Sequence, residues 1–85
     1  MPKFVIERNF AEQLEISNEG GLGIKRINSE EGVEWIFSFL SADKRKTYCL
    51  YEAPDEDSIR RAAVRANVPA DVITRVDKID PAIFA

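Results

Sequence analysis

The residues of this chain that could take part in chemistry are few, and histidine is not among them. Its absence excludes Ser-His-Asp and Cys-His catalysis, histidine general bases and most transition-metal sites, which use imidazole ligands. The single cysteine cannot form an intrachain disulfide or supply a zinc or iron–sulfur site from one chain. Gly20-Gly21-Leu22-Gly23 lacks the spacing of a phosphate loop. We therefore expect no cofactor and no catalytic residues, and favour a protein that is not an enzyme over the enzyme alternative given below.

Six side chains remain as candidates for contact with an organic ligand: Trp35, Phe37, Tyr48, Cys49, Tyr51 and Arg60. Trp35, Phe37 and Phe39 alternate along one segment, so a strand would place them on one face. Such a face can be a ligand platform, but open sheet faces are usually closed by packing, in a core or a subunit interface. The register of the following hairpin decides whether Tyr48 or Tyr51 joins that face, and the sequence leaves this open. A cysteine in the middle of a strand is usually a small buried hydrophobe.

Two charged runs have simpler explanations than a binding site. Asp55-Glu56-Asp57 lacks the spacing of a calcium loop and suits the start of a helix. Lys44-Arg45-Lys46 is too short for a nucleic-acid patch. The net charge of −3 also argues against nucleic acid and anionic membranes as partners. Without a long apolar run or a signal peptide at its start, the chain is expected to be cytoplasmic.

The hydrophobic pattern predicts a single globular domain over residues 1–85, with 45% hydrophobic and 32% charged residues. Strands are expected over 3–8, 33–41, 47–53 and 74–80, the last with Val76 and Ile79 as its apolar residues. One helix is expected within 12–31, bent or broken near its glycines, which each cost roughly 1 kcal/mol in a helix. Gly32 closes it. A second helix begins after Pro54 and ends at Asn67, with one further turn over 69–73.

The resulting order, βαββαβ, predicts an α+β, ferredoxin-like fold. Its four-stranded antiparallel sheet has strand order 4-1-3-2 and carries both helices on one face. The other face has no helix to cover it, although the strands are rich in aromatic residues. A second subunit, a ligand or the segment 82–85 must therefore shield it. We expect a homo-oligomer, first of all a dimer, with a barrel-like association of the two sheets.

An RNA-recognition domain shares this topology but does not fit the aromatic residues. Its third strand places two aromatic residues two positions apart, so that both stack on bases from one face. Tyr48 and Tyr51 are three positions apart and must point to opposite faces of a strand. The acidic pI of about 4.9 also opposes RNA binding.

Several short motifs resemble a family of small bacterial proteins, mostly of unknown function, some of which are described as nickel-binding. They are W-x-x-S from Trp35 to Ser38, Y-C-x-Y from Tyr48 to Tyr51, Ala53-Pro54, Asp80-Pro81 and the opening run 2–8. The resemblance covers most of the chain and is weakest over 10–32. It implies a ferredoxin-like fold, usually in a dimer.

The chain departs from this family at the positions that bear histidine. Family members commonly have W-x-H-S, where this chain has Phe37. They also have a second histidine in the later helix, where this chain has Arg60-Arg61-Ala62-Ala63. Nickel ligation by imidazole therefore cannot be carried over. The leading interpretation is a non-enzymatic domain that oligomerises through its open sheet face and binds a small molecule there. The alternatives are a small α+β-barrel enzyme, isomerase or monooxygenase-like, and nickel binding through Cys49 and carboxylates.

Overall fold

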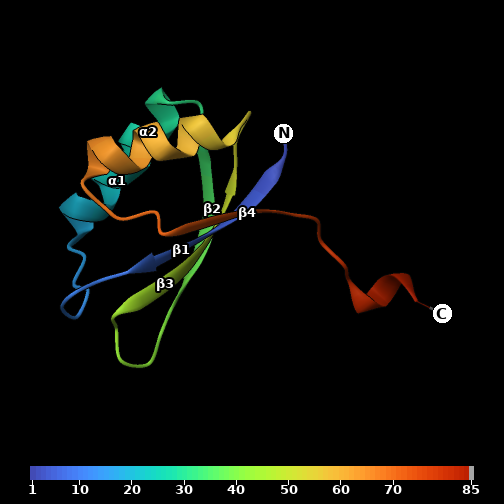
Figure 1. Ribbon diagram of the computed structural model, residues 1–85, viewed down its shortest axis with the longest axis horizontal. Coiled ribbons are helices and arrows are strands. Elements are labelled where there is room, and N and C mark those ends of the chain that lie inside the picture. The colour runs from blue at the N-terminus through green and yellow to red at the C-terminus, as the bar shows by residue number, and fades with distance from the viewer. Residues whose placement is uncertain (85) are drawn as a thin grey trace.

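The computed structural model describes residues 1–84, which form one four-stranded sheet and two helices that cover one of its faces (Figure 1). The elements are β1 Lys3–Asn9, α1 Asn18–Glu30, β2 Glu34–Leu40, β3 Lys46–Glu52, α2 Glu56–Ala66, β4 Val72–Val76 and the short 3-10 helix η1 Pro81–Ile83. The strands pair antiparallel in the order β2-β3-β1-β4. The predicted ferredoxin-like topology is confirmed, with β1 and β3 in the centre.

Side chains alternate between the two faces of the sheet along the central strands, and those on one face form the core. Phe4 and Ile6 of β1, and Cys49 and Tyr51 of β3, point toward the helices and are almost fully buried. Ile59 of α2, 1% exposed, packs onto them. The face of the sheet beneath the helices is called the helix face here, and the opposite face the open face. No helix within residues 1–84 is long and apolar enough to cross a membrane.

Helix α1 is continuous, so the prediction that it bends or breaks at its glycines is wrong. It begins at Asn18, with Ser17 as N-cap accepting a hydrogen bond from the Gly20 amide at 3.0 Å. The glycines therefore lie in its first turns, where the cap compensates for their poor helix propensity. Gly32 ends the helix region as predicted, because its φ of +74° is a conformation that favours glycine.

A β-bulge in β2 overturns the prediction that Trp35, Phe37 and Phe39 share one face. Trp35 pairs with Tyr51, but Phe37 pairs with Leu50, so Ile36 is an extra residue in the ladder. An extra residue reverses the alternation of the side chains beyond it. Trp35 consequently packs on the helix face against the core, whereas Phe37 and Phe39 point to the open face.

The last strand lies earlier than the predicted 74–80, and the predicted turn over 69–73 does not form. Ile73 pairs with Ile6 of β1 and packs against the core, which fixes β4 at Val72–Val76. Ile79, expected inside the strand, is 75% exposed. The chain beyond β4 extends away from the body (Figure 1), so its described residues do not cover the open face. Ala85, part of the predicted covering segment, lies outside the described residues.

Candidate functional site

The structure separates the six candidate ligand-binding residues into three places. Trp35, Cys49 and Tyr51 lie on the helix face, while Phe37 and Tyr48 lie on the open face. The two tyrosines thus point to opposite faces, as predicted. Arg60 joins neither group, because it lies exposed on α2 and pairs with Glu56 at 3.4 Å. The candidates therefore form two sites back to back, and each is described separately below.

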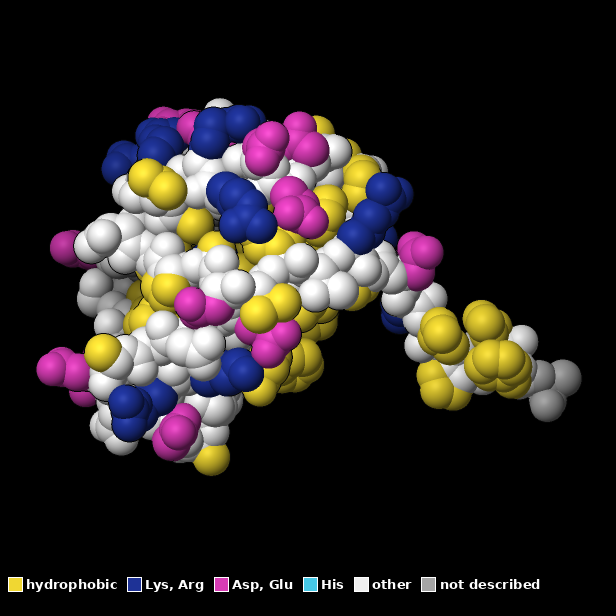
Figure 2. Space-filling view, viewed as in Figure 1, with side chains coloured by type: hydrophobic (Ala, Val, Ile, Leu, Met, Phe, Trp, Pro, Cys, Tyr) yellow, Lys and Arg dark blue, Asp and Glu magenta, His cyan; other side chains and the backbone are white. Residues whose placement is uncertain are grey.

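The open face carries a continuous set of apolar side chains from all four strands, called the open-face patch here. Its members are Val5, Ile36, Phe37, Phe39, Tyr48, Leu50, Val72 and Val76. Phe39 is 65% exposed and Phe37 47%, and their rings meet edge to face with centroids 5.3 Å apart. Figure 2 shows hydrophobic side chains on the side of the sheet away from the helices and again along the C-terminal segment. An exposed apolar patch rimmed by polar residues is often an interaction surface.

Ion pairs border the open-face patch and leave its centre uncharged. Lys3 pairs with Glu52 at 3.2 Å near one end of the central strands, and Lys46 pairs with Glu7 at 3.1 Å near the other. The Lys46 ammonium also lies 4.9 Å from the centroid of the Tyr48 ring. The patch thus has the pattern of an interface, with an apolar centre and a polar rim.

The helix face holds a cavity of about 90 Å³ beneath α1 and the segment that precedes it, called the helix-face cavity here. Its apolar walls come from Phe10, Leu14, Ile16, Ile24, Trp35 and Val68. Arg8, Ser38, Thr47, Cys49 and Tyr51 also line it, although almost all of its surface is apolar. Ile16 lines the cavity and is nevertheless 50% exposed, so the cavity opens to solvent at this residue.

Arg8 is the most unusual residue of the helix-face cavity, because its charge is buried without a carboxylate. It is 5% exposed, and its guanidinium donates hydrogen bonds to the Pro69 carbonyl and, at 3.3 Å, to the Tyr51 hydroxyl. It also lies 5.7 Å from the centroid of the Tyr51 ring. Burying a cation is costly unless other groups compensate for it, and a carbonyl and a ring do so only in part.

Two further polar groups lie near this guanidinium. Burial raises the pKa of Tyr51, although the positive charge of Arg8 opposes the shift. The side chain of Asn28 is close enough to lower that pKa, yet its Nδ2 has no hydrogen-bond partner within residues 1–84. Asn28 is 4% exposed, and a buried donor left unpaired costs about 1–3 kcal/mol.

The sulfur of Cys49 and the indole of Trp35 are each held by a neighbouring hydroxyl. The thiol is buried and lies 3.5 Å from the Thr47 hydroxyl, and the Trp35 Nε1–H donates to the Ser38 hydroxyl at 2.8 Å. No lysine or arginine pairs with the thiol in the described chain. Cys49 therefore behaves as the small buried hydrophobe that the sequence predicts.

Sequence reasoning missed Arg8 and Asn28, although a signal for Arg8 exists. Phe4, Ile6 and Arg8 alternate along β1, so Arg8 occupies a position that points into the core. A charged residue at such a position is rarely buried unless it is paired, and is therefore informative. Asn28 carries no comparable signal, because the pattern of α1 is too weak to show which face is buried.

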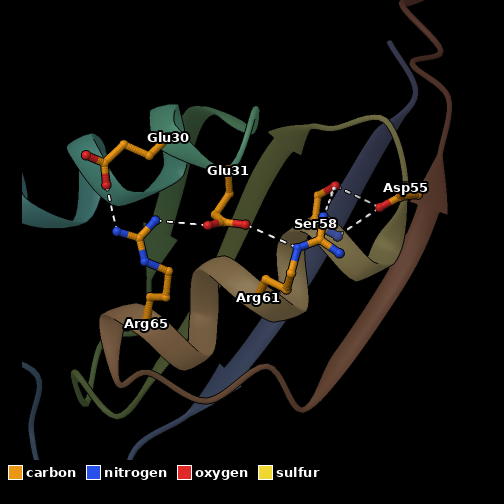
Figure 3. A network of polar contacts seen from close by, with 6 residues as sticks. All are labelled: Glu30, Glu31, Asp55, Ser58, Arg61 and Arg65. Atoms are coloured by element: carbon orange, nitrogen blue, oxygen red, sulfur yellow. Dashed lines mark hydrogen bonds and ion pairs between the residues drawn. The ribbon is translucent and has the colours of Figure 1, made fainter.

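A second cluster of charged residues lies on the exposed surface of the helices (Figure 3). Glu31 accepts from Arg61 at 3.1 Å and from Arg65 at 2.9 Å, and Arg65 also reaches Glu30 at 2.6 Å. Hydrogen bonds from Arg65 and Arg61 lower the pKa of Glu31. These ion pairs join the C-terminal end of α1 to α2, and the negative charges of the glutamates neutralise the positive charges of the arginines. The cluster is thus a structural contact between helices.

The comparisons with known proteins agree with this fold. The family model described as "Nickel responsive protein SCO4226-like" matches residues 4–76. The chain belongs to this SCO4226-like family. The crystal structure of SCO4226 from Streptomyces coelicolor A3(2) matches with a TM-score of 0.77 at 20% sequence identity. The match covers 92% of this chain and 99% of that one, and at this identity it shows the shared fold alone. No curated protein matches the chain significantly.

The residues of this SCO4226-like chain do not fit a nickel ion. The chain has no histidine, and within residues 1–84 no three Cys, Asp or Glu side chains lie close enough together to hold a metal. Phe37, which stands at the histidine of the W-x-H-S pattern, belongs to the apolar open-face patch. Cys49 lies on the other face of the sheet, so the two positions could not act together.

Proposed function

We propose that this protein acts as a homodimer in which the open-face patches of two copies pack against each other. The observation that carries the proposal is the exposure of the patch: five of its side chains are each at least 39% exposed, namely Ile36, Phe37, Phe39, Tyr48 and Val72. Removing apolar surface from water is the main favourable term in protein association. With its one thiol free and buried, the dimer suits the reducing cytoplasm.

The patch supplies part of the area that a dimer interface needs. At about 200 Å² per aromatic side chain, Phe37, Phe39 and Tyr48 alone expose about 300 Å². That area already reaches the lower end of the largest patch found on a typical monomer, ~300–600 Å². The aliphatic members of the patch and the neighbouring polar rim add to it. A standard interface buries about 800 Å² from each partner.

The charges favour a second copy over a charged partner. An interface with two-fold symmetry brings the same surface together with itself, so unpaired charge at its centre would meet like charge. Here four rim residues neutralise each other within one chain, as the pairs Lys3–Glu52 and Lys46–Glu7. The apolar centre can therefore face its own copy without repulsion.

The C-terminal segment offers further apolar surface to a second copy. Residues 77–84 extend from the edge strand β4, away from the body of their own chain (Figure 1). They expose Ile79 at 75%, Ile83 at 72% and Phe84 at 68%. The segment leaves β4 beside a hollow of about 390 Å³ that Ile36, Phe37 and Leu50 help to line. In the proposed dimer these apolar residues pack on the partner at the edge of the patch.

Neither alternative function gains support from the arrangement of side chains. The enzyme hypothesis needs Tyr48, Cys49, Tyr51 and Arg60 around one cavity, but they lie in three separate places. The nickel hypothesis needs several carboxylates gathered around Cys49, and no group of three Cys, Asp or Glu side chains that could hold a metal occurs within residues 1–84. Self-association is therefore the function that the geometry supports best.

The test is the mass of the untagged protein in solution, measured by light scattering after size-exclusion chromatography at several concentrations. The proposal predicts a mass near twice the 9.6 kDa of one chain, which falls only on strong dilution. A mass of one chain at every concentration would refute it. The location of the interface is tested separately by the variants described in the Discussion.

A further inference from the structure

We infer that the helix-face cavity is a binding site for a small organic anion, a short aliphatic carboxylate, whose charged group pairs with Arg8. The cavity lies on the opposite side of the sheet from the open-face patch. The inference therefore stands or falls independently of the proposed dimer. It depends on three observations: a buried cation, a set of hydrogen-bond donors and a small apolar space.

The first observation is the uncompensated charge of Arg8. None of the ion pairs formed within residues 1–84 includes this guanidinium, although it is 95% buried. Its bonds to Pro69 and Tyr51 use two of its five N–H groups, so donors remain for a further acceptor. A carboxylate beside it would form the charge-assisted hydrogen bonds that a guanidinium favours.

The second observation is that two buried side chains near Arg8, Tyr51 and Asn28, each have a hydrogen to donate. The Tyr51 hydroxyl accepts its bond from Arg8 and so retains its own hydrogen to give. Burial raises the pKa of Tyr51, which keeps this hydrogen in place at neutral pH. Asn28 does not itself line the cavity but lies beside Tyr51, and its buried Nδ2 has no partner in the described chain. A group rich in acceptors, such as a carboxylate, is the complement of this set.

The third observation is the size and character of the space. The cavity of about 90 Å³ is smaller than the ~150 Å³ cavity known to hold benzene. Leu14, Ile24 and Trp35 give it walls suited to a short hydrocarbon chain, and Ile16 stands at its opening. The space fits an anion with a few carbon atoms better than a bulky or doubly charged ligand.

The experiment titrates the wild-type protein with propionate, butyrate and the neutral butyramide, at constant ionic strength. Trp35 is the only tryptophan and lines the cavity, so its fluorescence reports binding, and calorimetry confirms it. We expect saturable binding of a carboxylate and at least tenfold weaker binding of butyramide, which has nearly the same shape without the charge. Equal binding of acid and amide, or no saturable signal with either acid, would overturn the inference.

Two variants locate the site. Arg8→Gln removes the charge and should reduce the affinity for the carboxylate at least tenfold, and Tyr51→Phe should reduce it several-fold while the walls remain. If Arg8→Gln does not fold, Tyr51→Phe and the comparison of butyrate with butyramide still decide the matter. The matched control is Arg60→Gln, because Arg60 is exposed on α2 and should not affect binding. Unchanged affinity in a folded Tyr51→Phe protein and a folded Arg8→Gln protein would contradict the assignment.

Discussion

Replacing Phe37 by glutamate should separate the proposed dimer without unfolding its subunits. Phe37 is 47% exposed in one copy, so the interface would newly bury about 90 Å² of this side chain, at ~200 Å² per aromatic residue. At about 25 cal/mol per Å², that burial contributes about 2 kcal/mol per copy. Two-fold symmetry doubles the effect to roughly 4–5 kcal/mol, which weakens the dimer about a thousandfold. A carboxylate desolvated against apolar neighbours adds to this loss.

The assay is light scattering after size-exclusion chromatography, with circular dichroism to show that each variant is folded. The matched control is Val64→Glu, because Val64 is 79% exposed on the outer side of α2 and also changes from apolar to acidic. We expect a folded monomer for Phe37→Glu at concentrations where wild type and Val64→Glu are dimers. If Phe37→Glu retains the wild-type mass while Val64→Glu loses it, the interface lies on the helices and our reasoning is wrong.

Three further predictions concern the stability of one subunit. Gly23→Ala should stabilise the protein by about 0.5–1 kcal/mol in urea unfolding, because its new Cβ meets open space and alanine favours a helix. Gly32→Ala should destabilise the protein by about 1–2 kcal/mol, because Gly32 has a φ of +74°. The reverse order of the two variants would contradict both assignments. Arg65 and Arg61 lower the pKa of Glu31 from 4.5, so its ionised form stabilises the fold above that value and this contribution is lost as the pH falls through the folded pKa. Thermal unfolding between about pH 5 and pH 3 should therefore depend less on pH in Glu31→Gln than in wild type, and an unchanged dependence would contradict this role of Glu31. Ile59→Ala should cost about 2–5 kcal/mol in urea unfolding, since Ile59 is 1% exposed, and a loss below 1 kcal/mol would show that the core is packed differently.

The fold could be predicted because its signals are local. Alternation along β1 and β3, and the caps of α2 at Asp55 and Asn67, are all visible in the sequence. The Asp55 carboxylate accepts from the Ser58 amide at 2.8 Å, and Asn67 adopts the left-handed conformation that ends a helix. Once six elements are in order, the handedness of the connections leaves few topologies.

The predictions were wrong where contacts between segments far apart in the sequence determine the local structure. The bulge at Ile36 depends on how β2 pairs with β3, and it moves Trp35 away from Phe37. The position of β4 depends on the packing of Ile73 against the core, which its own segment does not reveal. The grouping of the candidate residues was therefore only partly predictable: alternation separates Tyr48 from Tyr51, as expected, but the bulge also separates Trp35 from Phe37.

The central claim is that the open faces of two copies meet, and the most direct measurement is an isotope-filtered NOE spectrum of a mixed dimer. One half of the sample is labelled with ¹³C and ¹⁵N, and the other half is unlabelled, so only contacts between copies give signals. The proposal predicts intermolecular NOEs from Phe37, Phe39 and Leu50. Intermolecular NOEs confined to Val64 and its neighbours on α2, or none from the open-face patch, would contradict it.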